Sequence, residues 1–324
     1  MKPLAATTLR SLPAVLVPSG AGHLAAVDIG SNSFWLEIGE WQGGRYRCVD
    51  AMKETVRLGG GLGADGLLEA GAAARGLACL ERFGERLAGF APQQVRAVAT
   101  QTLREARNRA AFLARAEAAL GFPVEVIGGR DEAHLIYAGV ARLQPSPARR
   151  LVVDVGGRST ELIVGCDREV IDAESFPIGS VSLSMQHFAD GRLDAAAFGA
   201  AERAAAALFE PAIGRFARAD WAEALGSSGT VSAIARVLRV TGLGRGAVGP
   251  DALEALIERC LVAGHVDRLD LPGLTDERRQ VIAGCLSILH TLVRRLGIDD
   301  LQPAAGALRH GLIADLEATR TGAG

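Results

Sequence analysis

Apolar and polar positions alternate in three short stretches near the start of the chain, which predicts three β-strands. HLAAVDIG (23–30) is a short apolar run, SFWLEIGEW (33–41) alternates, and YRCVDAMKETVRL (46–58) alternates again after a Gly-Gly turn. A glycine-rich loop at 57–66 follows, and leucines at helical spacing over 67–87 predict an amphipathic helix. The opening is therefore expected to be a strand meander that leads into a helix.

Strands and helices continue to alternate beyond this opening, and a linker divides the series. QPSPARR (144–150) combines two prolines, a serine and two arginines, which is typical of a linker. The elements expected around it are strands at 95–100, 123–127 and 223–229, and helices at 106–120, from 129 with Asp131 as N-cap, 194–217, 229–240, 251–263 and 276–296. We predict a disordered segment over 1–22, an N-terminal domain over 23–145 and a C-terminal domain over 146–324. Packing of the last helix on the first domain is left open.

The second half repeats the opening of the first. AAVDIGSNSFWLEIG (25–39) aligns with LVVDVGGRSTELIVG (151–165), so that Asp28 meets Asp154 and Gly30 meets Gly156. Because each copy stands at the head of its half, chance similarity of two glycine-rich hairpins is the weaker explanation. The repeat predicts a duplicated α/β fold with a cleft between the copies.

Composition excludes several classes of protein. The 324 residues include 35 Lys and Arg and 37 Asp and Glu, and this balance excludes a globally basic nucleic-acid coat. Aromatic residues make up only 5%, which argues against stacking platforms for single-stranded nucleic acid. Five cysteines without a C-x-x-C motif indicate reduced thiols. With no signal-peptide pattern or apolar run long enough for a membrane span, we expect a cytoplasmic protein without nucleic-acid or membrane partners.

The repeated Asp-x-Gly-x-x-Ser turns carry the candidate chemistry. A tight turn of this kind points several backbone N–H groups into one concavity, which binds phosphate oxygens. An ionised aspartate only accepts hydrogen bonds, so it suits a hydrated Mg²⁺ better than the phosphate itself. Two structural Asx turns are the simpler alternative for either copy alone, whereas two copies at matching positions favour phosphate.

Six motifs in order resemble one family. They are VDIGSNS (27–33), TQTLR (100–104), GRDEA (129–133), VVDVGGRSTEL (152–162), GSSGT (226–230) and GALRHG (306–311). Together they resemble the exopolyphosphatase and guanosine pentaphosphatase (Ppx/GppA) family, in its short two-domain form. The resemblance implies duplicated RNase-H-like domains of the actin, hexokinase and Hsp70-like superfamily, with an interdomain cleft.

The resemblance also assigns roles to residues. Glu132 matches the catalytic base for water, and Arg104 matches an arginine that contacts phosphate. Asp154 and Glu161 match the acidic pair that holds Mg²⁺ or another hard divalent cation, with Asp28 in support. The expected phosphate-binding residues are Ser31, Asn32, Ser33, Gly156, Gly157, Ser159, Thr160, Gly229 and Thr230. Independently of the family, Glu132 is expected at a helix N-terminus, where the dipole favours an ionised carboxylate.

Arg158 departs from the family pattern, which usually has Gly or Ala at this position of the turn. Its permanent charge starts inside a phosphate-binding turn. We expect it to reach along the phosphate chain; the alternative is that it points to solvent.

These observations predict an exopolyphosphatase that releases orthophosphate from the end of inorganic polyphosphate. Guanosine pentaphosphate (pppGpp) 5′-phosphohydrolase is the alternative enzyme, and a non-catalytic polyphosphate or alarmone sensor is the alternative of another class. A kinase of the same superfamily would need an acceptor pocket and an aspartate base. GLGADG (61–66) matches a dinucleotide-binding pattern only formally, since it follows the third strand of a meander. A homodimer is left open.

Overall fold

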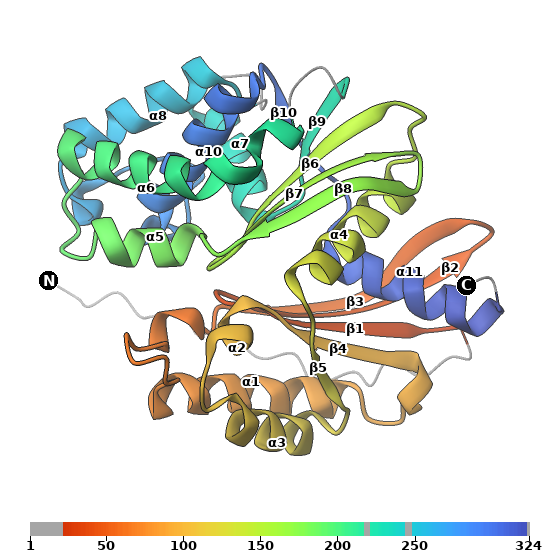
Figure 1. Ribbon diagram of the computed structural model, residues 1–324. Helices are drawn as coiled ribbons and strands as arrows, with labels where there is room; N and C mark the ends of the chain where they lie inside the picture. Colours follow the sequence, from red (N-terminus) through yellow and green to blue (C-terminus); the bar gives the residue numbers. More distant parts are fainter. Residues whose placement is uncertain (1–21, 217–220, 244–247, 323–324) are drawn as a thin grey trace, which may run out of the picture.

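The first half of the molecule is built on a five-stranded mixed sheet (Figure 1). The computed structural model describes residues 22–216, 221–243 and 248–322. The strands lie in the order β3-β2-β1-β4-β5, with β1–β2 and β2–β3 antiparallel and the other two pairs parallel. Their bounds are β1 (Leu24–Ile29), β2 (Phe34–Gln42), β3 (Arg45–Glu54), β4 (Val95–Ala99) and β5 (Val124–Val126).

The second half repeats this sheet. Its order is β10-β9-β6-β7-β8, so the first strand of each half again lies at the centre, beside its hairpin partner. The bounds are β6 (Arg149–Val155), β7 (Thr160–Cys166), β8 (Glu169–Phe176), β9 (Glu223–Gly226) and β10 (Leu301–Pro303). The same connectivity in both halves confirms the duplicated α/β fold that the repeat predicted.

Helices of the first half cover one face of its sheet (Figure 1). They are α1 (Ala70–Arg86), α2 (Gln101–Glu105) and α3 (Arg109–Leu120). Their apolar side chains join alternate residues of β1 and β2 in one buried core, which includes Val27, Phe34 and Leu80. This core holds the first hairpin turn in a fixed position.

Two helices fill the space between the sheets (Figure 1). α4 (Gly129–Leu143) packs on β7 and β8 of the second half, while α11 (Leu308–Thr321) packs on α4 and on β1 and β2 of the first half. Both belong to a buried core that takes Ala26 from one sheet and Ile163 from the other. The two halves therefore share an apolar interface. The domain limit at 145–146, which falls between α4 and β6, stays a prediction.

The other face of the second sheet carries the remaining helices and the largest core. These helices are α5 (Ser180–His187), α6 (Ala195–Ile213), α7 (Gly229–Thr241), α8 (Pro250–Ala263), α9 (Asp276–Arg279) and α10 (Ile282–Leu296). The single helix expected over 276–296 is thus broken at 280–281. The sequence analysis did not foresee α2, α5 or β10.

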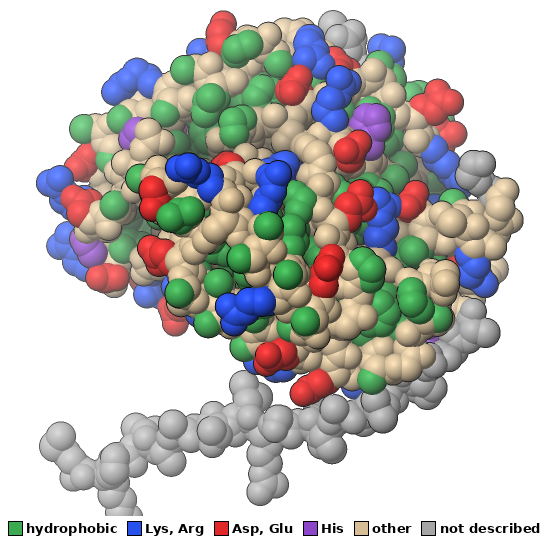
Figure 2. All heavy atoms as spheres, turned by 60° about the horizontal axis from the view of Figure 1, so that its bottom comes forward, with side chains coloured by type: hydrophobic (Ala, Val, Ile, Leu, Met, Phe, Trp, Pro, Cys, Tyr) green, Lys and Arg blue, Asp and Glu red, His purple; other side chains and the backbone are tan. Residues whose placement is uncertain are grey.

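None of the described helices is both long and apolar enough to span a bilayer. On the face shown in Figure 2, Lys and Arg side chains are interspersed with Asp and Glu rather than gathered in one patch. The disorder expected for 1–22 falls, except at Gly22, outside the described residues.

Candidate active site

A cleft of about 610 Å³ lies between the two halves, where the hairpin turns of both sheets meet. It collects most of the site residues predicted from the sequence: Asp28, Ser31, Asn32, Ser33, Glu132, Asp154, Gly156, Gly157, Ser159, Gly229 and Thr230. Arg104, Arg158, Thr160 and Glu161 are described but do not line the cleft.

The two hairpin turns have the same geometry. A Cβ atom at Gly30 would lie 2.8 Å from the carbonyl oxygen of Ser33, and a Cβ atom at Gly156 would lie 3.0 Å from the carbonyl oxygen of Ser159. Glycine is therefore needed at the same position of both turns, because each turn folds back on the residue three positions later. The sequence repeat thus reflects a repeated backbone shape.

The turns also contact one another. A Cβ atom at Gly157 would lie only 2.9 Å from the Cβ atom of Ser31 and 3.2 Å from the amide nitrogen of Asn32. Ser31 Oγ accepts a 2.7 Å hydrogen bond from Thr102 Oγ1, which leaves its own proton free to donate. Hydroxyl and amide groups from both halves consequently face one small volume, as phosphate oxygens require.

Two half-buried aspartates occupy equivalent places next to these turns. Burial, together with the negative charge of Glu132, raises the pKa of Asp28 to about 7, while Arg309 opposes the shift. Burial raises the pKa of Asp154 to about 6, although a hydrogen bond from Ser227 Oγ favours its ionised form. Ser227 lines the cleft and was missed by the sequence analysis, which selected only its neighbours in GSSGT.

Glu132 lies in the first turn of α4, which begins after Gly128 as N-cap; the prediction of Asp131 at that position was wrong. Burial raises the pKa of Glu132 to about 7 against the pull of Arg104. The dipole of α4 was expected to favour the ionised form, but the loss of hydration is the larger effect. A carboxyl group with a pKa near neutrality suits general-base work at pH 7.

Glu161 lies deeper than the cleft surface. It pairs with Asp154 across β6 and β7 and is only 1% exposed. Burial, together with the charges of Glu132 and Asp154, raises its pKa well above the usual range, and Ser175 Oγ donates a 2.8 Å hydrogen bond to it. Glu161 therefore supports the floor of the cleft from below.

Arg104 fixes the orientation of Glu132 from the side. Its Nη1 donates to Glu132 Oε2 at 2.7 Å and to the Ile127 carbonyl oxygen at 3.0 Å, and its Nε donates to Gln101 Oε1 at 2.8 Å. Its Nη2 is buried and has no hydrogen-bond partner. One arm of the guanidinium thus remains available as a donor beside the carboxylate.

Helix N-termini add positive potential. α5, α7 and α11 each begin with residues that line the cleft, and α4 places Glu132 there from its first turn. Ser228 Oγ caps α7 by accepting from the Val231 amide at 3.3 Å. Converging helix N-termini favour bound anions because their first N–H groups lack partners within the helix.

Cationic side chains line the same cleft as the carboxylates, and we call them the cationic wall; Asp28, Glu132 and Asp154 are called the acidic floor. Arg278 lies against the start of α7, since a Cβ atom at Gly229 would lie 2.6 Å from its Nη2. Arg309 stacks over the Trp35 ring at 4.5 Å and is ion-paired with Glu37. Only Arg309 belongs to a motif noted in the sequence, and the others come from segments that carry no local signal. The cationic wall comprises Lys53, Arg236, Arg239, Arg278 and Arg309.

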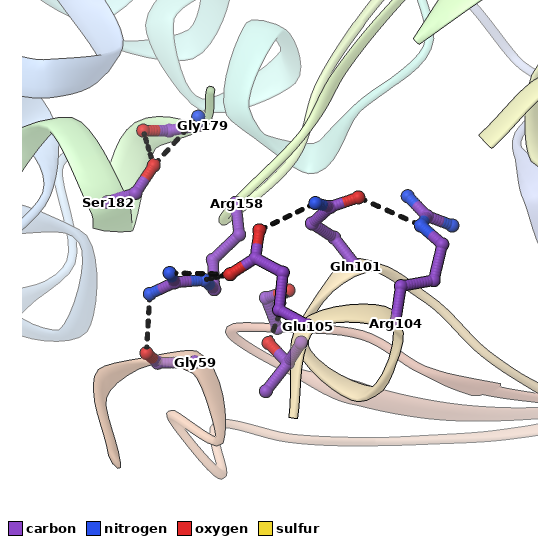
Figure 3. A network of polar contacts seen from close by, with 9 residues as sticks. Gly59, Gln101, Arg104, Glu105, Arg158, Gly179 and Ser182 are labelled. Carbon is purple, nitrogen blue, oxygen red and sulfur yellow. Dashed lines mark hydrogen bonds and ion pairs between the residues drawn. The ribbon is translucent and has the colours of Figure 1, made fainter. Parts of the chain in front are cut away.

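Two predicted phosphate ligands are used elsewhere. Thr160 is fully buried, and its hydroxyl donates to the Ile178 carbonyl oxygen at 2.6 Å. The Arg158 guanidinium crosses to the first half, where it binds Glu105 and the Gly59 carbonyl oxygen (Figure 3). The Arg158 side chain is only 17% exposed and paired with Glu105, so the solvent-facing alternative does not hold. Its contact with a phosphate chain stays a prediction.

Comparisons with known proteins agree with this geometry. The model of the Ppx/GppA phosphatase family matches residues 38–320. The chain belongs to this family. It is 37% identical over 306 residues to the "Putative exopolyphosphatase" of Haemophilus influenzae. This alignment covers 94% of this chain and 95% of that protein.

Solved structures of this family share the fold. The crystal structure of an exopolyphosphatase from Cytophaga hutchinsonii superposes with a TM-score of 0.81 at 22% identity, covering 91% of this chain and 98% of that one. The Aquifex aeolicus Ppx/GppA family member gives a TM-score of 0.73 at 22% identity, covering 92% and 98%. The two-domain α/β architecture is thus the architecture of Ppx/GppA proteins.

The carboxylates of this Ppx/GppA protein fit a magnesium ion in part. Among the described residues, no group of three or more His, Cys, Asp or Glu side chains is arranged to hold a metal. Asp28 Oδ1, however, is buried without a hydrogen-bond partner, and Asp154 occupies the equivalent place in the other turn. Mg²⁺ is commonly held by one or two carboxylates together with waters and substrate phosphates, so a site with two aspartates fits its usual ligand number.

Proposed function

We propose that this Ppx/GppA protein is an exopolyphosphatase that hydrolyses the terminal phosphoanhydride of inorganic polyphosphate and releases orthophosphate. The observation that carries the proposal is that one cleft is lined both by the carboxylates of the acidic floor and by the cations of the cationic wall. The floor offers a base and a place for a cation, while the wall offers a path for a polyanion. Membership of a phosphatase family makes water the natural acceptor.

Glu132 is the proposed base. Its Oε2 is held by Arg104, so the carboxylate is fixed while a water molecule attacks the terminal phosphorus in line and gives up its proton. Because Arg104 does not line the cleft, it acts through Glu132: its positive charge favours the ionised form of the base. Amide and hydroxyl groups of the two turns hold the other oxygens.

Asp28 and Asp154 are the proposed ligands of Mg²⁺, which would lower the charge of the bound phosphates. Mg²⁺ bound there would lower the pKa of both aspartates, which burial raises, because its positive charge favours the ionised carboxylates. Glu161 stabilises this arrangement from beneath rather than by direct contact with substrate.

The cationic wall is the proposed seat of the phosphates that follow the terminal one. Burial lowers the pKa of Lys53, and so do the neighbouring charges of Arg278, Arg309 and Arg236. Glu277 opposes this shift. Crowded cations repel each other until a polyanion binds between them, so the wall favours a chain of phosphates. A homodimer and a cytoplasmic location stay predictions from the sequence.

Initial rates on long polyphosphate, tripolyphosphate and pppGpp, measured side by side with Mg²⁺, test the proposal. We expect orthophosphate release from polyphosphate without any added acceptor. A rate on pppGpp that far exceeds both others would establish the alternative phosphohydrolase. Tight binding of polyphosphate without phosphate release would establish the sensor.

A further inference from the structure

Arg158 links the two halves of the molecule at the edge of the active site. Its backbone belongs to the second turn, between Gly157 and Ser159, while its side chain leaves the cleft (Figure 3). Its Nε and Nη2 donate to Glu105 Oε2 at 3.0 Å and 2.7 Å, and its Nη1 donates to the Gly59 carbonyl oxygen at 3.0 Å. The fork thus joins the second-half turn to α2 and to the loop before α1.

The contact is closely packed. A Cβ atom at Gly59 would lie 2.8 Å from Arg158 Cδ and 3.0 Å from Thr102 Oγ1, so a larger residue at Gly59 would displace the arginine. The Arg158 side chain is only 17% exposed. An ion pair of this kind is less screened by solvent than a surface pair and holds a defined geometry.

The chain of hydrogen bonds continues from Glu105 to the proposed base. Gln101 Nε2 donates to Glu105 Oε1 at 2.6 Å, and Gln101 Oε1 accepts from Arg104 Nε at 2.8 Å (Figure 3). Arg104 in turn donates to Glu132. The orientation of the Gln101 amide is dictated by chemistry, because a carboxylate only accepts and a guanidinium only donates.

We propose that Arg158 and Gln101 are positioning residues, which hold Arg104 and Glu132 in the geometry for hydrolysis only while the two halves are correctly placed. This inference rests on the proposed function. A shift of the second-half turn would move Arg158 and, through its ion pair, Glu105. The hydrogen bonds of Gln101 would then carry this displacement to Arg104. Neither Arg158 nor Gln101 touches substrate, so their loss acts on the turnover rate through Arg104.

Single substitutions give the first test. Arg158→Ala and Gln101→Leu should each lower kcat on polyphosphate on the order of 10-fold while KM changes by less than about 3-fold, because misplaced catalytic groups cost rate rather than binding. The double variant should be little worse than the poorer single variant, since both break one chain. Arg82→Ala removes an ion pair to Glu54 within the first half and is the matched control, with kcat unchanged.

A charge reversal distinguishes a positioning role of Arg158 in catalysis from a role in stability alone, in which its ion pair only holds the two halves together. The pair Arg158→Glu with Glu105→Arg restores an ion pair across the halves, so the melting temperature should recover. kcat should nevertheless stay low. In this variant both position 105 and Arg104 carry guanidinium groups, which only donate hydrogen bonds, and Gln101 has a single amide oxygen to accept from them. Adding Gln101→Glu supplies two acceptor oxygens and should raise kcat, whereas Gln101→Glu alone should lower it by placing a carboxylate beside Glu105.

Recovery of both melting temperature and kcat by the charge reversal would overturn the inference. The inference would also be overturned if the single variants have a lower melting temperature but keep kcat within about 3-fold of wild type. This second outcome can be measured even if the charge-reversed variant does not fold. Failure of the proposed function has a different signature, since the unsubstituted protein would then release no orthophosphate from polyphosphate.

Discussion

Replacing Glu132 with glutamine should remove the base and leave the rest of the cleft in place. The amide oxygen still accepts from Arg104 Nη1, at a position where the carboxylate now accepts at 2.7 Å, so the free Nη2 keeps its direction. The amide cannot take a proton from water. A base of this kind contributes roughly 10²–10⁴ to the rate, so we expect kcat/KM to fall by about that factor.

The pKa of Glu132 determines how this loss varies with pH. With a pKa of about 7, about nine molecules in ten are ionised at pH 8 and about one in ten at pH 6. The wild-type kcat/KM should fall through this range as pH is lowered, so the ratio of wild type to Glu132→Gln should be about 10-fold smaller at pH 6 than at pH 8.

The assay is orthophosphate release from polyphosphate at saturating Mg²⁺ over pH 5.5–9. Asp131→Asn is the matched control, because it removes an exposed negative charge from the same helical turn and should leave the rate unchanged. A Glu132→Gln variant with more than about a tenth of the wild-type rate at pH 8 would refute the assignment. An unchanged ratio between pH 6 and pH 8 would show that another group sets the pH dependence.

Three further predictions concern the metal, stability and the cationic wall. Asp154→Ala should shift the Mg²⁺ titration of the rate to higher concentration, and a curve that overlays the wild type would place the metal elsewhere. Asp28→Asn should stabilise the protein without divalent cations: folding raises the pKa of Asp28 from 3.8 to about 7, so the folded state binds the extra proton and loses stability as pH rises from 4 to 7. The gain in the free energy of unfolding should therefore grow over that range, up to at most about 4 kcal/mol, and a gain that does not vary with pH would contradict it. Arg278→Ala should raise KM for long polyphosphate and flatten its salt dependence, whereas exposed Arg192→Ala should do neither; equal behaviour of the two variants would remove Arg278 from the binding path.

The sequence predicted the parts of the fold that depend on local pattern. Alternation in the first hairpin and its repeat gave both sheets, and both turns contain a glycine where a Cβ atom would meet the following backbone. The break between α9 and α10 was not predicted, because residues 276–296 keep helical spacing throughout. The break places Arg278 of α9 in the cleft lining.

Residues of the candidate site could be predicted where they belong to a short local motif. Glu132 and Asp154 both come from such motifs. The partner of Arg158 could not be predicted, because Glu105 lies 53 residues earlier and on the other half. The shift of the Glu132 pKa was missed for the same reason, since local sequence indicates a helix dipole but not the depth of burial.

Hydrolysis of polyphosphate in ¹⁸O-enriched water tests the central claim most directly. If a water activated by Glu132 attacks the terminal phosphorus, each orthophosphate released should carry one ¹⁸O atom from solvent, and the shortened chain should carry none. Mass spectrometry of the orthophosphate and ³¹P spectra of the chain ends report both. Label in the shortened chain, or orthophosphate without label, would contradict the account.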